Sequence, residues 1–375
     1  MKVIVIGAGI VGASTAYHLV KKGAEVVVAD QFHKGQATAA GAGIVCPWIT
    51  RVEDQIWYSL AKAAACYYPS LISQLEENGE DHTGYGMVGA LAVSNDEKVL
   101  DALEAKVRTR RAETEAVGEI SRLTPEEARK LFPPLREDLA ALHVTGGARV
   151  DGRLLRDALK NAAQKLGAQF FNGEASLEVA KGKIVGVHVN GNFIEANAVV
   201  VTAGAWLPQI LEPFGIKIHV EPQRGQIVHL KFPDQDTSKW PVILPQGSSH
   251  YLVSFDDERV VVGATRETGS GFDYRVTASG AKEVIDEALA VAPGLADGTL
   301  HEIRIGFRPF GKDILPLLGP IPAVKGLIIA NGLGASGLTF GPYTGMLAAG
   351  LALEEELPHD LSPFNPLRYA EVTNG

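Results

Sequence analysis

Cysteine is scarce in this chain, since Cys46 and Cys66 are the only two among 375 residues. Two isolated thiols exclude a disulfide framework, and they form neither a C-x-x-C pair nor a metal-ligand spacing, so we expect no metal site. Long apolar runs are also missing, because no stretch reaches the ~20 residues of a membrane span. The apolar run at the N-terminus is too short for a signal peptide. These absences lead us to expect a cytoplasmic protein without a membrane span.

Positive charge is in the minority, with 35 Lys and Arg against 44 Asp and Glu and a formal net charge of −9. This balance argues against nucleic acid as a partner. The hydrophobic fraction of 46% and the charged fraction of 21% are typical of a globular protein. The length predicts about two domains. Association with further copies of the chain is left open.

Residues 1–30 carry the strongest pattern. Val3–Ile6 is a β-branched run, as expected of a strand buried on both faces. The glycine-rich turn Gly7–Gly12 follows directly, and an apolar-periodic helix is expected to run to about Lys22. A second buried strand, Glu25–Ala29, ends on Asp30. This is a complete βαβ unit with G-x-G-x-x-G at its first turn, which predicts a dinucleotide site.

Each glycine of this turn has a physical role in such a site. Gly7 allows the tight turn, Gly9 lets a pyrophosphate approach the backbone, and Gly12 lets the helix pack close to the strand. The helix N-terminus offers free N–H groups and a partial positive charge to the phosphates. Asp30 is placed to accept both ribose hydroxyls, and its charge argues against the 2′-phosphate of NADP.

A second loop of small residues, Gly35–Ile44, comes one strand later. It has two interpretations: a flexible connection between domains, or a second backbone cradle for the same cofactor. In the second case Thr38 offers its hydroxyl to a phosphate.

Two further buried strands end in small residues. Ala196–Thr202 runs into Ala203–Trp206, with Gly204 in the turn. Gly326–Ala330 runs into the glycine-rich stretch Asn331–Pro342, which we expect to lead into a helix from about 342 to 356. In doubly wound folds the ligand lies at the carboxyl ends of such strands.

The segments between these strands predict a second domain. Residues 54–78 have helical periodicity, divided by Pro69, and Asn95–Glu113 predicts an exposed helix. From Ile216 to Phe310 the pattern changes to alternating strands, as expected of an antiparallel sheet.

Three polar residues of this second domain are candidates for substrate contacts. Arg308 lies on a predicted strand and is either a carboxylate clamp or half of a structural ion pair. Tyr251 either hydrogen-bonds a substrate or caps the core. Arg266 either binds an acidic substrate group or is an exposed loop arginine.

With these motifs in order, the chain resembles the glycine oxidase and D-amino-acid oxidase superfamily of FAD enzymes, which includes sarcosine oxidase and D-amino-acid dehydrogenase. The resemblance covers nearly the whole chain. It rests on the first glycine-rich turn with Asp30, Thr38–Ile44, Val200–Trp206, Pro222–Gln226, His250–Val253, Gly263–Thr265, Gly306–Pro309 and Ala330–Pro342.

The resemblance implies an α/β fold, in which a Rossmann-like FAD-binding domain is interleaved with an α+β substrate domain on an antiparallel sheet. We expect residues 1–45, 145–215 and 320–375 to form the FAD-binding domain. Residues 46–144 and 216–319 then form the substrate-binding domain.

The resemblance also implies roles for individual residues. Arg308 corresponds to the arginine that clamps the substrate carboxylate, and Tyr251 to a tyrosine beside it. The remaining positions are expected to contact FAD: Ile10, Val11, Asp30 and Gln31 at the AMP half, Ala175 at the adenine, Thr38, Ala42, Gly43 and Ile44 at the pyrophosphate and flavin, and Leu333, Gly334, Ala335, Ser336, Gly337 and Leu338 at the flavin pyrimidine.

Two departures from the family bear on the substrate. Ala335 stands where glycine oxidases carry a further substrate arginine, and Arg266 stands where they carry an apolar residue. A third departure concerns the cofactor: no cysteine follows Cys66, so the covalent flavin linkage of sarcosine oxidases is excluded and non-covalent FAD is expected.

The function that follows is FAD-dependent oxidation of the C–N bond of glycine, a D-amino acid or an N-alkyl amino acid. Hydride transfer to flavin N5 gives an imine that hydrolyses to a 2-oxo acid and ammonia or an amine. The electron acceptor is O2 or an electron carrier such as a quinone, so oxidase and dehydrogenase remain alternatives. A FAD-binding regulatory or assembly protein without redox turnover is the alternative from another class.

Overall fold

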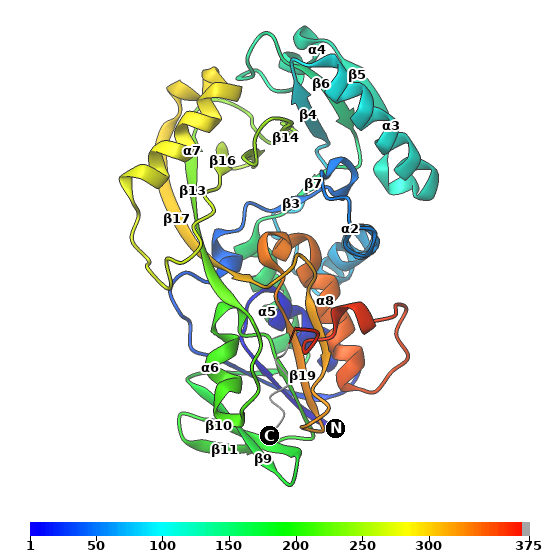
Figure 1. The fold of residues 1–375 in the computed structure, drawn as a ribbon, viewed down its shortest axis with the longest axis vertical. Coiled ribbons are helices and arrows are strands. Elements are labelled where there is room, and N and C mark those ends of the chain that lie inside the picture. The colour runs from blue at the N-terminus through cyan, green and yellow to red at the C-terminus, as the bar shows by residue number, and fades with distance from the viewer. Residues whose placement is uncertain (370–375) are drawn as a thin grey trace.

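Two large sheets organise the chain in the computed structural model, which describes residues 1–369 (Figure 1). The six-stranded sheet lies in the lower half of this view, and the eight-stranded sheet lies in the upper half with α7, α3 and α4. The fold class predicted from the sequence is therefore confirmed: a doubly wound sheet and a second, mostly antiparallel one.

The six-stranded sheet has the order β18-β19-β12-β1-β2-β8 and is parallel except for the edge pair β18–β19. Its strands are Lys2–Ile6 (β1), Glu25–Asp30 (β2), Gln169–Asn172 (β8), Ala198–Val201 (β12), Leu317–Pro320 (β18) and Leu327–Asn331 (β19).

Both faces of this sheet are covered, which explains its near-continuous apolar strands. Val3 and Val5 of β1 pack in one core with the helices, and Ile4 and Ile6 pack in another on the opposite face. The helices of the first face are Ile10–Lys21 (α1), Gln55–Glu77 (α2), Gly152–Lys165 (α5) and Gly337–Ala352 (α8). The second face carries a small sheet of Ala175–Ala180 (β9), Lys183–Val189 (β10) and Asn192–Glu195 (β11), and the short helix Leu207–Leu211 (α6).

The eight-stranded sheet has the order β17-β13-β16-β15-β14-β4-β6-β5. It is antiparallel except that β14 and β4 pair in parallel, which joins the two separate chain segments that build it. Its strands are Ala90–Ser94 (β4), Ile120–Leu123 (β5), Ala140–Val144 (β6), Glu221–Lys231 (β13), Val242–Pro245 (β14), Tyr251–Ser254 (β15), Arg259–Gly263 (β16) and Thr299–Phe310 (β17).

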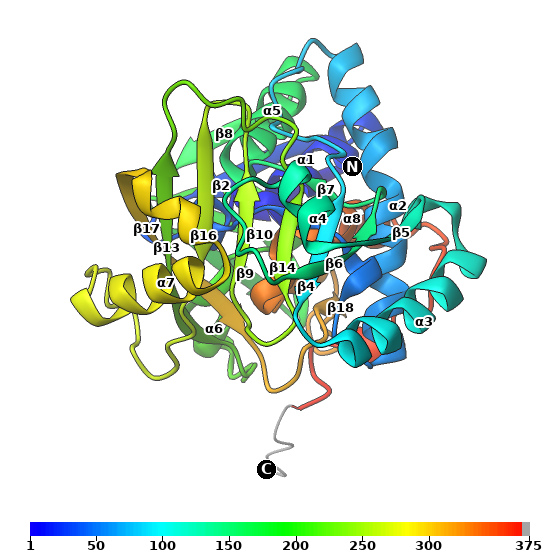
Figure 2. The same ribbon diagram turned by 90° about the horizontal axis from the view of Figure 1, so that it is seen from above.

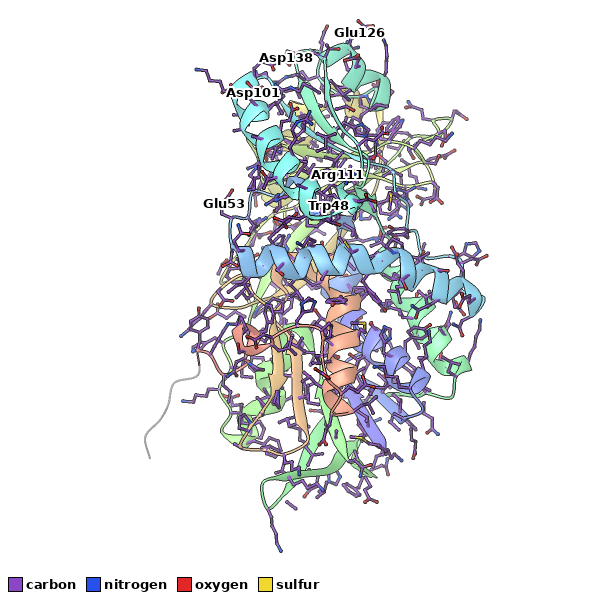
Figure 3. The ribbon with its side chains drawn as sticks, turned by 90° about the vertical axis from the view of Figure 1, so that its right-hand side faces the viewer. Trp48, Glu53, Asp101, Arg111, Glu126 and Asp138 are labelled. Carbon is purple, nitrogen blue, oxygen red and sulfur yellow. The ribbon has the colours of Figure 1, made fainter. Side chains whose placement is uncertain are left out.

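Helices Pro125–Leu131 (α4) and Ala278–Val291 (α7) cover the outer face of this sheet, which Figure 2 shows from above. Helix Glu97–Glu113 (α3) packs on the other face of β4 and β6. In Figure 3, α2 crosses the side of the molecule between the half that carries α3 and the half that carries α8. A two-residue ladder of Ile44–Val45 (β3) with Ala148–Arg149 (β7) also lies between the halves.

The sheets divide the chain at nearly the positions proposed for the domains, although β18 begins at Leu317, before the expected boundary at 320. The interleaved two-domain division itself stays a prediction. Residues 370–375 of its last segment lie outside the described residues. Among residues 1–369, no helix combines the length and the apolar character that a membrane crossing requires.

Two expectations about proline were wrong. Pro69 does not divide the second helix, because α2 is continuous from Gln55 to Glu77. A proline inside a helix costs about 3 kcal/mol, but Leu71 and Leu75 beyond it are fully buried. Each such side chain contributes ~1.5–3 kcal/mol, so packing outweighs the interruption.

The C-terminal helix begins at Gly337 rather than near Pro342, which lies in its second turn. Pro342 has no N–H to donate to the carbonyl of Leu338, four residues earlier. The hydroxyl of Tyr68 on α2 donates to that carbonyl instead. A tertiary contact therefore satisfies the group that the proline leaves without a partner.

Candidate active site

A cavity of about 920 Å³ lies where the carboxyl ends of β1, β2, β12 and β19 meet the inner ends of β13, β15 and β17. With the exception of Gly12, every site residue predicted from the sequence lines it: Gly7, Gly9, Ile10, Val11, Asp30, Gln31, Thr38, Ala42, Gly43, Ile44, Ala175, Gly204, Tyr251, Arg308 and Leu333–Leu338. Residues separated by up to 331 positions in the sequence, Gly7 and Leu338, thus border one space.

Gly12 has a packing role in the first turn. A Cβ at this position would lie 1.8 Å from the carbonyl oxygen of Gly7 and 2.5 Å from Oγ1 of Thr202. Gly7 itself has a φ of +100°, which favours glycine. The close approach of α1 to β1 and β12 therefore requires both glycines.

The helix ends at this cavity differ from the other long helices. The side chain of the N-cap residue caps α2, α3, α5 and α7, whereas in the described part of the chain the N-cap residues of α1 and α8, Gly9 and Ser336, make no such hydrogen bond. Free N–H groups at a helix N-terminus form a site for phosphate or another anion. Thr38 from the second loop lies at the same place, because its Oγ1 accepts a hydrogen bond of 3.0 Å from the N–H of Ile10.

Asp30 borders the cavity with 8% of its surface exposed. Its carboxylate accepts hydrogen bonds from the backbone N–H groups of Ala8 and Phe32 and from Nε2 of Gln36, 3.1 Å away. These bonds fix the orientation of the carboxylate. Two carboxylate oxygens have about four lone-pair sites, so capacity for a further donor such as a ribose hydroxyl remains.

Arg308 points its guanidinium into the other end of the cavity from β17. Nη1 donates to the carbonyl of Thr265 at 2.9 Å and approaches Oε1 of Gln223 at 3.4 Å. The guanidinium lies over Gly225 on β13, where an added Cβ would come within 2.7–2.9 Å of it. Sequence reasoning included Gly225 only as part of the Pro222–Gln226 motif and assigned it no role in the site.

The charge of Arg308 is not matched by an acid. Within residues 1–369 no carboxylate lies within 4 Å of its nitrogens, whereas Arg304 on the same strand face pairs with Glu302 at 2.5 Å. Burial lowers the pKa of the Arg308 guanidinium, and the positive charge of Arg266 acts in the same direction. A half-buried arginine with only neutral partners is therefore available to an anionic ligand.

Tyr251 lies beside this arginine on β15. Burial raises the pKa of its hydroxyl, while the charges of Arg308 and Arg266 oppose that shift. The hydroxyl therefore stays protonated at neutral pH and can donate a hydrogen bond. Arg266 is exposed, as one of its two interpretations expected, but it lines the cavity as well.

In the described part of the chain no group of three or more His, Cys, Asp or Glu side chains could hold a metal ion. Cys46 lines the cavity next to the second loop, and burial raises the pKa of its thiol to about 12. The cavity therefore offers anion-binding helix ends on one side and arginine on the other.

Comparison with known proteins gives close matches. The family described as "DAO: FAD dependent oxidoreductase" matches residues 2–351. The uncharacterized oxidoreductase YurR of Bacillus subtilis is 50% identical over 364 residues, which are 97% of this chain and 98% of YurR.

Two solved structures are similar over the whole length. Iminodiacetate oxidase from Chelativorans sp. BNC1 has a TM-score of 0.94 at 50% identity, with 97% of this chain and 98% of that chain covered. Glycine oxidase from Geobacillus kaustophilus has a TM-score of 0.83 at 26% identity, with 98% of each chain covered.

Proposed function

Because this chain belongs to the DAO family of FAD-dependent oxidoreductases, we propose that it oxidises a small amino acid whose carboxylate is bound by Arg308. Family membership confirms the predicted resemblance, the use of FAD, and the oxidation of amino-acid C–N bonds as the reaction class. The proposal concerns the substrate and the residues that bind it.

The observation that carries this proposal is the unpaired charge of Arg308. Other arginines of the same sheet have acidic partners: Arg224 pairs with Glu267 at 2.5 Å, and Arg259 pairs with Asp151 at 2.7 Å. Arg308 instead faces a cavity and contacts only neutral oxygens. A planar guanidinium with free donors binds a carboxylate through two parallel hydrogen bonds.

The residues at the opposite end of the cavity fit FAD. The turn from Gly7 to Gly12 and the N-terminus of α1, where Thr38 adds its hydroxyl, suit a pyrophosphate, and Asp30 suits a ribose. The uncapped N-terminus of α8 suits the electron-rich edge of a flavin. When bound, FAD accepts two electrons and the hydrogen of the substrate α-carbon, and the resulting imine is hydrolysed by water.

The protein's own contribution is position and charge. Arg308 fixes the carboxylate, and the hydroxyl of Tyr251 donates a hydrogen bond beside it. Two guanidinium groups near the amine disfavour its protonated form, because like charges lower the pKa of an ammonium group. The neutral amine is the form that can be oxidised.

FAD is held without a covalent bond in this proposal. Cys46 is the only cysteine at the cavity, and a thiol with a pKa of about 12 does not supply the thiolate needed for a bond. Acid precipitation should therefore release the yellow colour into the supernatant; colour that stays with the pellet would contradict this part.

Among the three predicted substrate types we favour an N-alkyl amino acid. The support is the 50% identity to iminodiacetate oxidase, since iminodiacetate is glycine with an N-carboxymethyl group. Glycine oxidase is the more distant relative, at 26% identity.

The test is an anaerobic screen in which glycine, sarcosine, iminodiacetate, and D- and L-amino acids are mixed with the purified yellow protein. Bleaching of the flavin near 450 nm identifies substrates, and oxygen consumption with the best one separates an oxidase from a dehydrogenase. If no amino acid bleaches the flavin, the proposed function is wrong and a FAD-binding protein without turnover becomes the better explanation.

A further inference from the structure

A second arginine faces the substrate end of the cavity. Arg266 lines the same space as Arg308 and Tyr251. It directly follows Thr265, whose carbonyl accepts the hydrogen bond from Arg308. It also lies close to β15, because Tyr251 is the cross-strand partner of Gly263, three residues before Arg266.

Arg266 has no acidic partner of its own. Within residues 1–369 no carboxylate lies within 4 Å of its guanidinium, and its side chain donates no hydrogen bond to another described residue. The nearest acid in the sequence, Glu267, is committed elsewhere: its carboxylate binds Arg224 and accepts hydrogen bonds from Gln226 and Thr265.

The acids that line the cavity do not balance this charge either. Asp30 is held by backbone N–H groups at the dinucleotide end, and Asp313 pairs with Arg368 at 2.7 Å. Glu174 follows β8, also at the dinucleotide end. Arg51 also lines this end, where its guanidinium donates to the backbone carbonyls of Pro245 and Ser248. The described residues that line the substrate end therefore include three arginines and no acid, and Arg266 is the one without a hydrogen bond to another described residue.

The guanidinium groups of Arg266 and Arg308 border one cavity and repel each other, and the charge of Arg266 lowers the pKa of the more buried Arg308. A ligand with one carboxylate would neutralise only one of them. A ligand with two carboxylates would neutralise both, and each arginine would gain a charge-assisted hydrogen bond.

We propose that Arg266 binds a second carboxylate, so that the preferred substrate is an amine that carries two carboxylates. This inference rests on the proposed function and narrows its substrate class. The second carboxylate is either on the N-alkyl group, as in iminodiacetate, or on the side chain, as in aspartate. Arg266 is then a specificity-determining residue, whereas Arg308 serves every substrate.

Binding is tested first with ligands that cannot be oxidised at nitrogen. Diglycolate and methoxyacetate have an ether oxygen in place of the amine and carry two carboxylates and one, respectively. Calorimetry with the holoenzyme should show that diglycolate binds roughly 10- to 150-fold more tightly, the range expected for one hydrogen bond between charged groups.

In the Arg266→Ala holoenzyme this preference should fall to within about threefold, and Arg266→Lys should restore part of it, since an ammonium lacks the fork. The matched control is Arg108→Ala, which removes the same charge from an exposed position on α3, where Arg108 pairs with Glu104. The control should keep the full preference. Equal affinity of wild type for the two ligands, or an unchanged preference in Arg266→Ala, would overturn the inference.

Turnover gives the second readout and separates the two sources of the carboxylate. The ratio of kcat/KM for iminodiacetate over sarcosine, and for D-aspartate over D-alanine, should each be compared in wild type and Arg266→Ala. The pair whose ratio falls at least tenfold identifies the group that Arg266 binds. If the flavin is bleached by amino acids but neither ratio changes, the second-carboxylate site is refuted while the proposed function stands.

Discussion

Replacing Arg308 by alanine tests the carboxylate clamp most directly. The guanidinium is half-buried, and its hydrogen bonds go to the Thr265 carbonyl and the Gln223 side chain, both neutral. The charge that it would balance is therefore the substrate carboxylate. Removing one partner of such a desolvated pair costs about 2–5 kcal/mol. Since each ~1.4 kcal/mol is tenfold, Arg308→Ala should lower kcat/KM by about 30- to several-thousand-fold.

The assay compares steady-state kinetics and FAD content of wild type, Arg308→Ala and Arg308→Lys. FAD should stay bound in both variants, because the residue belongs to the eight-stranded sheet and contacts none of the glycine turns. The lysine variant should recover only part of the rate, since an ammonium is a point charge without the fork. An amine without a carboxylate should be a poor substrate for wild type and nearly insensitive to the substitution. Wild-type kcat/KM in Arg308→Ala on the best amino acid would refute the assigned site.

Three further predictions concern the cradle, the clamp and the fold. Gly9→Val should yield colourless protein, because a Cβ at Gly9 already lies 3.3 Å from the Thr38 hydroxyl and a branched side chain would fill the phosphate turn; absorbance at purification checks this. Gly225→Ala should lower kcat/KM but leave FAD content intact, because its Cβ would displace the guanidinium 2.7–2.9 Å away. Burial and the neighbouring arginines lower the pKa of His229, which is 1% exposed, to about 3. Below pH 6.5 this histidine is therefore protonated in the unfolded chain but stays neutral in the folded protein. The free energy of unfolding should therefore drop by about 2 kcal/mol from this group between pH 6.5 and 5, and the pH slope of Tm should be smaller in His229→Gln.

The dinucleotide site could be predicted because its requirements are local. Gly7 has a positive φ and Gly12 packs against the carbonyl of Gly7, so the two glycines leave a recognisable spacing, although Thr202 after β12 also crowds both positions. The buried strands of the six-stranded sheet could be predicted equally well, because a strand that is covered on both faces is apolar at nearly every position. The roles of individual FAD-contacting residues and the domain boundaries stay predictions.

Other features depended on partners distant in the sequence. Pro342 reads as a helix start, but the Leu338 carbonyl that it leaves free is satisfied by Tyr68, 270 residues away. Pro69 predicts a break in the helix, but the burial of Leu71 and Leu75 stabilises α2 as one continuous helix. In both cases the local preference is a few kcal/mol, and tertiary packing exceeds it.

The sequence by itself therefore determined the fold class, the glycine turns and the presence of an arginine on a strand. These features depend on the conformational preferences and the apolar pattern of residues that are neighbours in the sequence. Only the tertiary structure decided which arginines are paired. Arg304 and Arg308 look alike in the sequence, but Glu302 neutralises one and a cavity faces the other. For Arg266 the sequence left two interpretations open, and the structure shows that it is exposed and also lines the cavity. The Glu302–Arg304 pair is local, since the two residues are two positions apart on one strand. The neutral surroundings of Arg308 are not, because folding brings Gln223 and Thr265 to it from distant parts of the chain.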